Sequence, residues 1–311
     1  MAEISTPTPR PRHPERTRKL WERFNSNAGC KEDLPDPHER MLVSAWEMCK
    51  RLGVDPALRK TTVVSEQELE QICKKNAYLL DLAKSALDRV PGVLQGIPGV
   101  LLFTDREGTI LHVAGEPTPR LRTSDLSNFV RGAQFSESIA GSNGIAAAIA
   151  QRAPVRIHAA EHYCEGLHRW TCTAAPILDP FGDAVLGVVD FSVVSDYEID
   201  TAALTSSLAH KIQEDLRVQI ELERVRLVKE YATYTARYPS DAILVYDRAG
   251  RLVRCTHGID LNSIRGAFAR SMPAPKETHP IFLPRVQLAI GTVLVISRPR
   301  STEYSILAAA S

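Results

Sequence analysis

The 311-residue sequence predicts an α+β fold, in which an antiparallel sheet with flanking helices is followed by a long helix and a small second α+β module. Two observations support this prediction. Between residues 85 and 200, short apolar runs separated by turn signals alternate with helix-like stretches, as in an antiparallel sheet packed by helices. Residues 201–236 then contain neither glycine nor proline, which is typical of one long helix.

The sequence before the sheet predicts a tail and a helical segment. Residues 1–36, rich in Pro, Thr and Arg at their start, are expected to be a disordered basic tail. Residues 37–84 are expected to be helical and to pack on the following domain. A single second helix is expected from the capping box that begins at Ser65 to about Val90. The first helix should end at Gly53, and its apolar face comprises Met41, Leu42, Ala45, Trp46 and Cys49.

The domain expected at residues 85–200 contains five strand candidates and one helix candidate. Two strands form a hairpin around the turn DREG, in which Gly108 supplies a positive φ, and two more are joined by the turn DPFGD. The alanine-rich run Gly144–Gln151 is expected to be helical. The strand candidates are Gly99–Thr104, Thr109–Val113, Val155–His158, Cys172–Ile177 and Ala184–Phe191.

The long helix predicted at residues 201–236 carries an apolar stripe in a charged background. Such a stripe suits a short parallel coiled coil between two copies of the chain, and packing of the helix on its own domain is the alternative. Residues 237–300 are expected to form a small module with a hairpin around the turn DRAG and one more strand pair, followed by a tail at residues 301–311. The stripe comprises Leu204, Leu208, Ile212, Leu216, Ile220, Leu222, Val225 and Leu227.

Composition narrows the function classes. The formal net charge of +1 gives the chain as a whole no preference for nucleic acid or an acidic membrane, although DNA contact through the basic N-terminal segment stays open. The six cysteines show no CxxC pair, which favours reduced thiols in the cytoplasm. No apolar run approaches the ~20 residues of a membrane span, and the N-terminus lacks the apolar core of a signal peptide. Neither a phosphate-binding loop nor an HExxH motif occurs.

Two segments are candidates for a binding site. The first is GAQFSESIAGSNG at residues 132–144, in which Asn143 or Ser142 can cap the helix that follows. Backbone N–H groups at such a helix start attract anions, although a loop of this composition is usually only a turn.

The second segment is EHYCEGLHRWTC at residues 161–172, which concentrates histidine, cysteine, glutamate and tryptophan. Its spacing fits no closed zinc site, so hydrogen-bonding histidines and a tryptophan in an apolar pocket are expected rather than a metal. A redox pair of cysteines is a further alternative, weakened because no neighbouring lysine would lower a thiol pKa. The residues of metal-ligating type are His162, Cys164, His168 and Cys172.

These segments together resemble the N-terminal sensory region of the acetoin- and dihydroxyacetone-regulator family of sigma-54-dependent transcriptional activators. The matching pieces lie between His38 and Ser192, about half the chain; they include ERMLVSAWEMCKRLGVDP, VLLFTDREGTIL, GAQFSESIAGSNGIAAAI and EHYCEGLHRWTCTAAPILDPFGDAVLGVVDFS. The resemblance implies a GAF-type domain, which is an antiparallel sheet with helices on one side and a ligand cavity on the other, and the later hairpin resembles a reduced PAS-like module. The departures are small: Ala45 is inserted before Trp46, and GSN replaces the usual GTN.

The family continues into an AAA+ ATPase and a helix-turn-helix, and this sequence shows neither, so only sensing carries over. We therefore expect a non-enzymatic cytoplasmic small-molecule sensor and transcription-regulatory protein. Its output is expected to pass through the helix at residues 201–234 to a dimer mate or to a transcription-machinery or regulator partner. The cofactor and the effector stay unidentified. The predicted ligand-binding residues are Phe135, Ser136, Asn143, Ile145, His162, His168, Trp170 and Cys172.

Two alternatives remain open. One is a GAF-based redox or metal-dependent sensor or reductase that uses Cys164, Cys172, His162 and His168. The other is a dimerisation scaffold whose pocket is vestigial.

Overall fold

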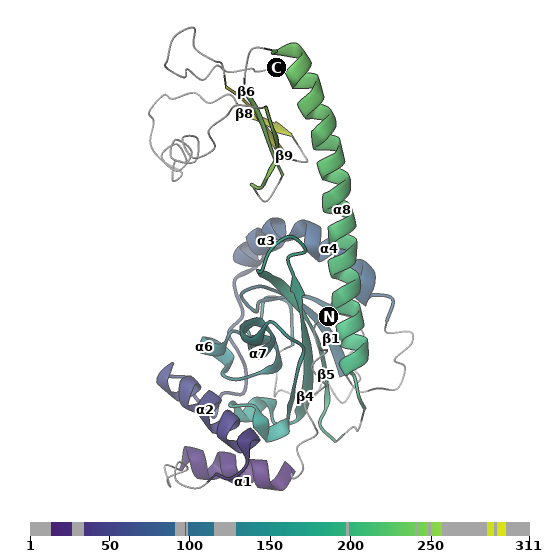
Figure 1. Ribbon diagram of the computed structural model, residues 1–311. Helices are drawn as coiled ribbons and strands as arrows, with labels where there is room; N and C mark the ends of the chain where they lie inside the picture. Colours follow the sequence, from purple (N-terminus) through teal and green to yellow (C-terminus); the bar gives the residue numbers. More distant parts are fainter. Residues whose placement is uncertain are drawn as a thin grey trace. The chain divides into compact units, whose positions relative to one another are not determined.

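The computed structural model describes residues 14–26, 34–90, 97, 99–114, 129–196, 199–239, 242–247, 250–256, 285–288 and 291–296. The chain divides into two compact units, Met1–Leu216 and Arg217–Ser311 (Figure 1). The division falls inside helix α8 (Ala202–Arg237), so each unit includes part of this helix.

A five-stranded antiparallel sheet with the order β2-β1-β5-β4-β3 is the centre of the first unit. The β1–β2 hairpin forms as predicted, because Gly108 has a φ of +83° and the Asp105 carboxylate accepts hydrogen bonds from the N–H groups of Glu107 and Thr109. The strands are β1 (Gly99–Asp105), β2 (Ile110–Ala114), β3 (Val155–His158), β4 (Trp170–Leu178) and β5 (Val185–Val194).

The two faces of this sheet are covered by different helices, since alternate residues of a strand point to opposite faces. Helix α7 (Gly144–Gln151) covers the face to which Ala174 and Val188 contribute. The first part of α8 meets the other face, where Thr201 Oγ1 donates a hydrogen bond to Thr173 Oγ1 at 2.8 Å. Figure 1 shows α7 and α8 on opposite sides of the sheet.

The N-terminal residues correct one prediction. Residues 14–25, expected within a disordered tail, form helix α1 (Pro14–Asn25), and residues 1–13 and 27–33 lie outside the described residues. The expectation was wrong for this stretch because Leu20 and Phe24 lie one helical turn apart and are buried in a cluster with Trp46 of α2 (Pro37–Arg51).

A second correction concerns the helix expected up to about Val90. The structure has two helices there, α3 (Glu66–Lys75) and α4 (Ala77–Leu87), which are separated at Asn76. The Asn76 side chain donates a hydrogen bond to Ile72 O at 2.9 Å, which is the local competition with the backbone that ends helices. The predicted cap is present, since Ser65 Oγ accepts from the N–H of Glu68.

The described residues of the first unit also form three short elements: α6 (Glu137–Ala140), η1 (Ala159–Glu161) and η2 (Glu165–Leu167). No helix among the described residues has the length and apolar character needed to cross a membrane.

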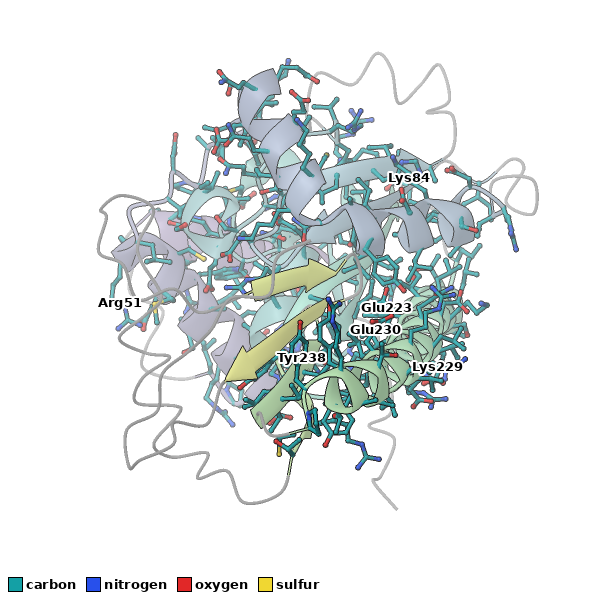
Figure 2. The ribbon with its side chains drawn as sticks, turned by 90° about the horizontal axis from the view of Figure 1, so that it is seen from above. Arg51, Lys84, Glu223, Lys229, Glu230 and Tyr238 are labelled. Atoms are coloured by element: carbon teal, nitrogen blue, oxygen red, sulfur yellow. The ribbon has the colours of Figure 1, made fainter. Side chains whose placement is uncertain are left out.

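The second unit is α+β, as predicted. Its four-stranded antiparallel sheet has the order β7-β6-β9-β8, and Leu227 of α8 packs with Ile243 and Val245 of β6. Figure 2 labels Glu223, Lys229 and Glu230 on this part of α8. The tail expected at residues 301–311 lies outside the described residues. The strands are β6 (Ala242–Asp247), β7 (Leu252–Cys255), β8 (Arg285–Leu288) and β9 (Gly291–Ile296).

Candidate functional site

Four of the predicted ligand-binding residues meet in one buried cluster between α7 and the sheet. Trp170 and Cys172 occupy alternate positions of β4, Ile145 lies in the first turn of α7, and Phe135 precedes α6. Phe129 stacks on Phe135 with ring centroids 5.3 Å apart and meets the Trp170 ring edge-on at 4.9 Å. These aromatic and aliphatic side chains form the kind of wall that small-molecule sites use. We call this set the α7-face cluster.

Asn143 has a structural position beside the α7-face cluster. Its Oδ1 accepts from the N–H of Ala146 at 3.0 Å, which caps α7 as expected. Its Nδ2 donates to Phe135 O at 3.1 Å and to Gly141 O at 2.8 Å. The side-chain amide therefore holds the preceding loop, and its bonds are made within the protein.

Ser136 and His168 are not brought to the α7-face cluster. Ser136 Oγ lies 3.3 Å from the hydroxyl of Ser138 at the start of α6. His168 Nε2 lies 3.1 Å from His162 O, and its ring meets that of Trp21 in α1 at 4.6 Å. The 3-10 turn η2 directs His168 toward α1. The spacing between His162, His168 and Trp170 in the sequence does not reveal this direction.

His162 is fully buried, and one of its ring nitrogens has no partner. Nδ1 lies 2.9 Å from Ala159 O, whereas Nε2 has no hydrogen-bond partner among the described residues. Burial lowers the pKa of His162 to about 3, so the ring is neutral, and the proton on Nδ1 leaves Nε2 as an acceptor.

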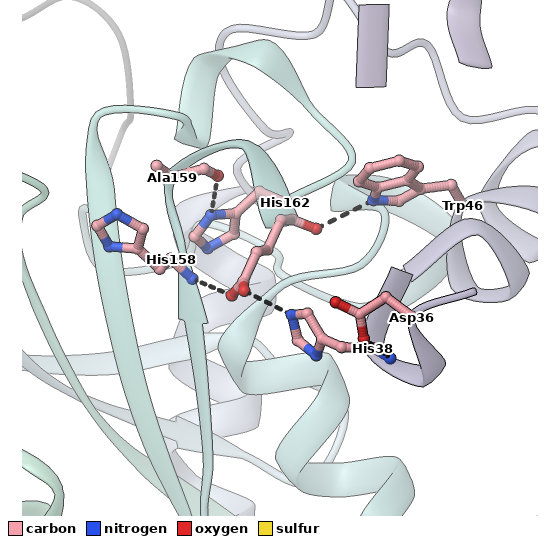
Figure 3. Close-up of polar contacts among 7 residues, drawn as sticks. Asp36, His38, Trp46, His158, Ala159 and His162 are labelled. Carbon is pink, nitrogen blue, oxygen red and sulfur yellow. Dashed lines mark hydrogen bonds and ion pairs between the residues drawn. The ribbon is translucent and has the colours of Figure 1, made fainter. Parts of the chain in front are cut away.

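Glu161 is a buried residue that was not among the predicted site residues. Figure 3 shows its partners His38, Trp46 and His158, with the hydrogen bonds as dashed lines. Its Oε1 lies 2.8 Å from His38 Nε2, its Oε2 accepts from the N–H of His158 at 2.7 Å, and its backbone oxygen accepts from Trp46 Nε1 at 3.0 Å. The hydrogen bond to Glu161 raises the pKa of His38. These bonds tie α2 to the segment after β3. The spacing of His158 and Glu161, which form a capping box, was the available signal.

Asp190 is the second buried residue at the site that was not among the predicted site residues. It lies on β5 with 1% of its surface exposed, and Ser192 Oγ donates a hydrogen bond to its Oδ2 at 2.6 Å. Its Oδ1 has no partner among the described residues, and burial raises the pKa of this carboxyl to about 7. Ser192 Oγ also lies 3.1 Å from Cys172 Sγ, so the carboxyl adjoins the α7-face cluster. Strand alternation from Val188 would have placed Asp190 on this face.

The buried cysteines Cys49, Cys164 and Cys172 have the opposite character to reactive thiols. Burial raises the pKa of Cys49 to about 11, that of Cys164 to about 12 and that of Cys172 well above its ordinary value. The thiolate is the reactive form, so these environments argue against the redox alternative. Within the described part of the chain, no three His, Cys, Asp or Glu side chains converge as a metal site would require.

A small surface pocket is lined by Phe135 of the α7-face cluster. Its volume is about 10 Å³, and its lining also includes Ala140, Cys164 and Leu167 together with residues 58–61. This volume is about that of one water-sized sphere, so the pocket touches the cluster at Phe135 and is too small for an organic effector in this conformation.

Comparison with known proteins identifies the family. The family described as "MimR, N-terminal domain" matches residues 14–212, which is more than half of the chain. The chain belongs to this family.

The curated proteins that the chain resembles include transcriptional activators. The acetoin dehydrogenase operon transcriptional activator AcoR of Bacillus subtilis is 28% identical over 222 residues, covering 70% of this chain and 36% of AcoR. The propane 2-monooxygenase operon transcriptional activator MimR of Mycolicibacterium smegmatis is 24% identical over 212 residues, covering 68% of this chain and 35% of MimR. The chain thus spans about a third of the length of these relatives. The resemblance to the sensory region of sigma-54-dependent activators is confirmed.

A solved structure shows the same fold. In the complex of DhaR(N) with DhaL from E. coli, a chain of 17% sequence identity matches with a TM-score of 0.58, covering 82% of this chain and 97% of that one. The predicted α+β class with a GAF-type antiparallel sheet is confirmed.

Proposed function

We propose that this chain is a non-enzymatic cytoplasmic sensor that regulates transcription by binding a small-molecule effector at the α7-face cluster. The observation that carries the proposal is the convergence of Phe135, Ile145, Trp170 and Cys172 in one buried cluster next to the unpartnered carboxyl oxygen of Asp190. The relatives activate operons named for acetoin dehydrogenase and propane 2-monooxygenase, which supports an effector of a few carbon atoms. Asn143 acts in this proposal by holding the loop that shapes the cluster.

The proposed organisation follows the expected boundaries. Residues 85–200 form the sensing domain, residues 37–84 pack on it, and residues 237–300 form the PAS-like module. The helix at residues 201–236 carries the output to a dimer mate or a regulator partner. A location beside the transcription machinery is supported by the relatives AcoR and MimR, which are transcriptional activators.

Dimerisation would use the part of the α8 stripe that the monomer leaves exposed. Ile212 and Leu216 are buried in the first unit, and Leu227 is buried in the second. The predicted stripe therefore contains both buried and exposed residues. Leu222 and Val225 are 50% and 57% exposed. A neighbouring apolar position, Val218, is 48% exposed and completes a coiled-coil spacing of four and three residues.

Charge placement favours a parallel pair of helices. If Val218, Leu222 and Val225 occupy the core a and d positions of the coiled coil, Glu221 lies at a flanking g position and Arg226 at a flanking e position. In a parallel pair, Glu221 of one copy then faces Arg226 of the other copy, five residues further along. Leu222→Glu combined with Val225→Glu should convert a dimer to a monomer in light scattering. Lys74→Glu, at an exposed position of α3 and outside α8 altogether, is the control. An unchanged mass in the double variant would contradict dimerisation through α8.

The effector site is tested by a thermal-stability screen of small metabolites against the full chain. A bound compound should stabilise the wild-type protein, and Trp170→Ala should abolish this stabilisation. Because Trp170 is buried, Phe129→Ala at the edge of the cluster is the second, milder variant. Trp21→Ala, which removes an aromatic ring from α1, is the matched control. Stabilisation that survives in both cluster variants would rule out this site.

A scaffold with a vestigial pocket is the second candidate function. It is favoured by the close packing at Gly144, where an added Cβ would stand only 2.9 Å from Cys172 Cβ. Failure of every compound in the screen, together with dimerisation through α8, would select it.

A further inference from the structure

The carboxyl of Asp190 lies in the interior of the first unit, and one of its two oxygens accepts a hydrogen bond. Ser192 serves Oδ2, and Oδ1 has no partner among the described residues although the side chain is 1% exposed. A buried polar oxygen without a partner is unfavourable, and such groups in proteins call for a ligand, a water or a functional reason.

The surroundings of this oxygen are small and apolar. An added Cβ at Gly144, the first residue of α7, would stand 3.2 Å from Oδ1, 2.9 Å from Cys172 Cβ and 3.6 Å from Ala174 Cβ. The first residue of α7 therefore covers Oδ1 of Asp190, and Val188 lies on the same face of β5. A group that reaches Oδ1 must be compact and must move the first turn of α7 away from the sheet.

We propose that Asp190 anchors the effector, and that the effector is a small neutral alcohol whose hydroxyl group hydrogen-bonds to Oδ1 while its carbon skeleton packs in the α7-face cluster. This inference rests on the proposed function, because it names the ligand class of the same site. Displacement of the first turn of α7 is then the direct structural consequence of binding.

The hydroxyl group fits this position better than the other polar groups of similar size. It donates one hydrogen and also accepts, so it satisfies Oδ1 whether the carboxyl is ionised or protonated. A ketone has no donor and can serve only the protonated form. An ammonium group brings three donors and a charge into a site whose described neighbours offer one vacant acceptor among apolar side chains.

The test compares matched compounds on the full chain by calorimetry and thermal stability. Isopropanol, acetone and isopropylamine share one shape, and sec-butanol, butanone and sec-butylamine form a second matched set. At about pH 8.5, where a carboxyl of pKa about 7 is ionised, the alcohols should bind about tenfold or more tightly than their ketone and amine counterparts. Equal affinity within either set would overturn the assignment.

Variants locate the bond. Asp190→Leu replaces the carboxyl by an apolar group of similar size, so it is expected to fold and to weaken isopropanol binding by about 10- to 100-fold. Asp190→Asn, which keeps a donor and an acceptor, should recover part of the affinity. Ser192→Ala is the control, because it removes the partner of Oδ2 and leaves Oδ1 in place. Unchanged alcohol affinity in Asp190→Leu would overturn the proposal.

A spectroscopic readout separates anchoring from a merely structural role. Near neutral pH, isopropanol should shift the infrared carbonyl band of the protonated Asp190 carboxyl, and this difference band should be missing in Asp190→Leu. An unshifted band at saturation would contradict a direct bond. If no alcohol binds while another screened compound binds with Trp170 dependence, this inference fails and the proposed function stands.

Discussion

Glu161→Gln is expected to destabilise the first unit by about 2–3 kcal/mol. The wild-type carboxylate is 4% exposed and serves two donors, His38 Nε2 and the N–H of His158. A glutamine side chain keeps one acceptor oxygen, so its amide N–H₂ must face one of these donors. A buried donor left unsatisfied costs about 1–3 kcal/mol, and a lost bond to a charged partner about 1.5–3 kcal/mol.

The effect should depend on pH in a defined direction. Glu161 raises the pKa of His38 above its ordinary value of 6.5, so the folded state holds the proton more tightly than the unfolded chain. The stability contributed by the pair is fully present below pH 6.5 and is lost as the pH rises through the folded-state pKa. The substitution should therefore cost more at about pH 5.5 than at about pH 8.5.

Tryptophan fluorescence in urea is the assay, because all three tryptophans of the chain, Trp21, Trp46 and Trp170, lie in the first unit. Glu165→Gln is the matched control, since Glu165 has a side chain 48% exposed and contacts Arg59 only at 3.8 Å; it should change stability by less than about 0.5 kcal/mol. A Glu161→Gln cost as small as that of the control, or one equal at both pH values, would refute the reasoning.

Three further changes test other parts of the first unit. In urea titrations the stability of the wild type should fall by at most about 4 kcal/mol as the pH rises from 3.8 to 7, because the raised pKa of Asp190 means that folding favours the protonated carboxyl. Asp190→Asn, which has no carboxyl to titrate, should remove this fall. A wild type whose stability does not fall over this range would contradict the prediction. Gly108→Ala should lower thermal stability about 1–2 kcal/mol more than Gly53→Ala, since both have positive φ but only at Gly108 would a Cβ meet backbone, at 3.1 Å; equal costs would argue against the steric term. Trp46→Phe, by losing the bond to Glu161 O, should cost about 1–3 kcal/mol in the urea assay, and a neutral result would count against that bond.

The features that the sequence predicted are those with local signals. The β1–β2 hairpin depends on a turn that Gly108 permits, and the starts of α3 and α7 depend on the caps Ser65 and Asn143. Each of these signals lies within four residues of the structure it specifies, so no long-range contact is needed to interpret it.

The features that it missed depend on residues far apart in the chain. Helix α1 is stabilised by burial against Trp46, and Glu161 meets a histidine 123 residues earlier. Asp190 looked like an ordinary polar residue in a strand, because the sequence alone did not show which face α7 covers. His168 was placed in the predicted pocket on composition, whereas the turn η2 directs it to α1. Tertiary packing decides these cases, and a single sequence carries little trace of it.

The bonds that hold the N-terminal helices have a consequence for synthesis of the chain. Trp21 and Trp46 donate to backbone oxygens 142 and 115 residues further along, at Tyr163 and Glu161. At about 5–20 residues per second, Trp46 is synthesised roughly 6–23 seconds before Glu161. During that interval α2 can pack on α1, but its contacts with the segment after β3 cannot form. Helices α1 and α2 therefore complete their docking only after that segment has been made, and chaperone dependence should concentrate on the nascent stretch that contains these two helices.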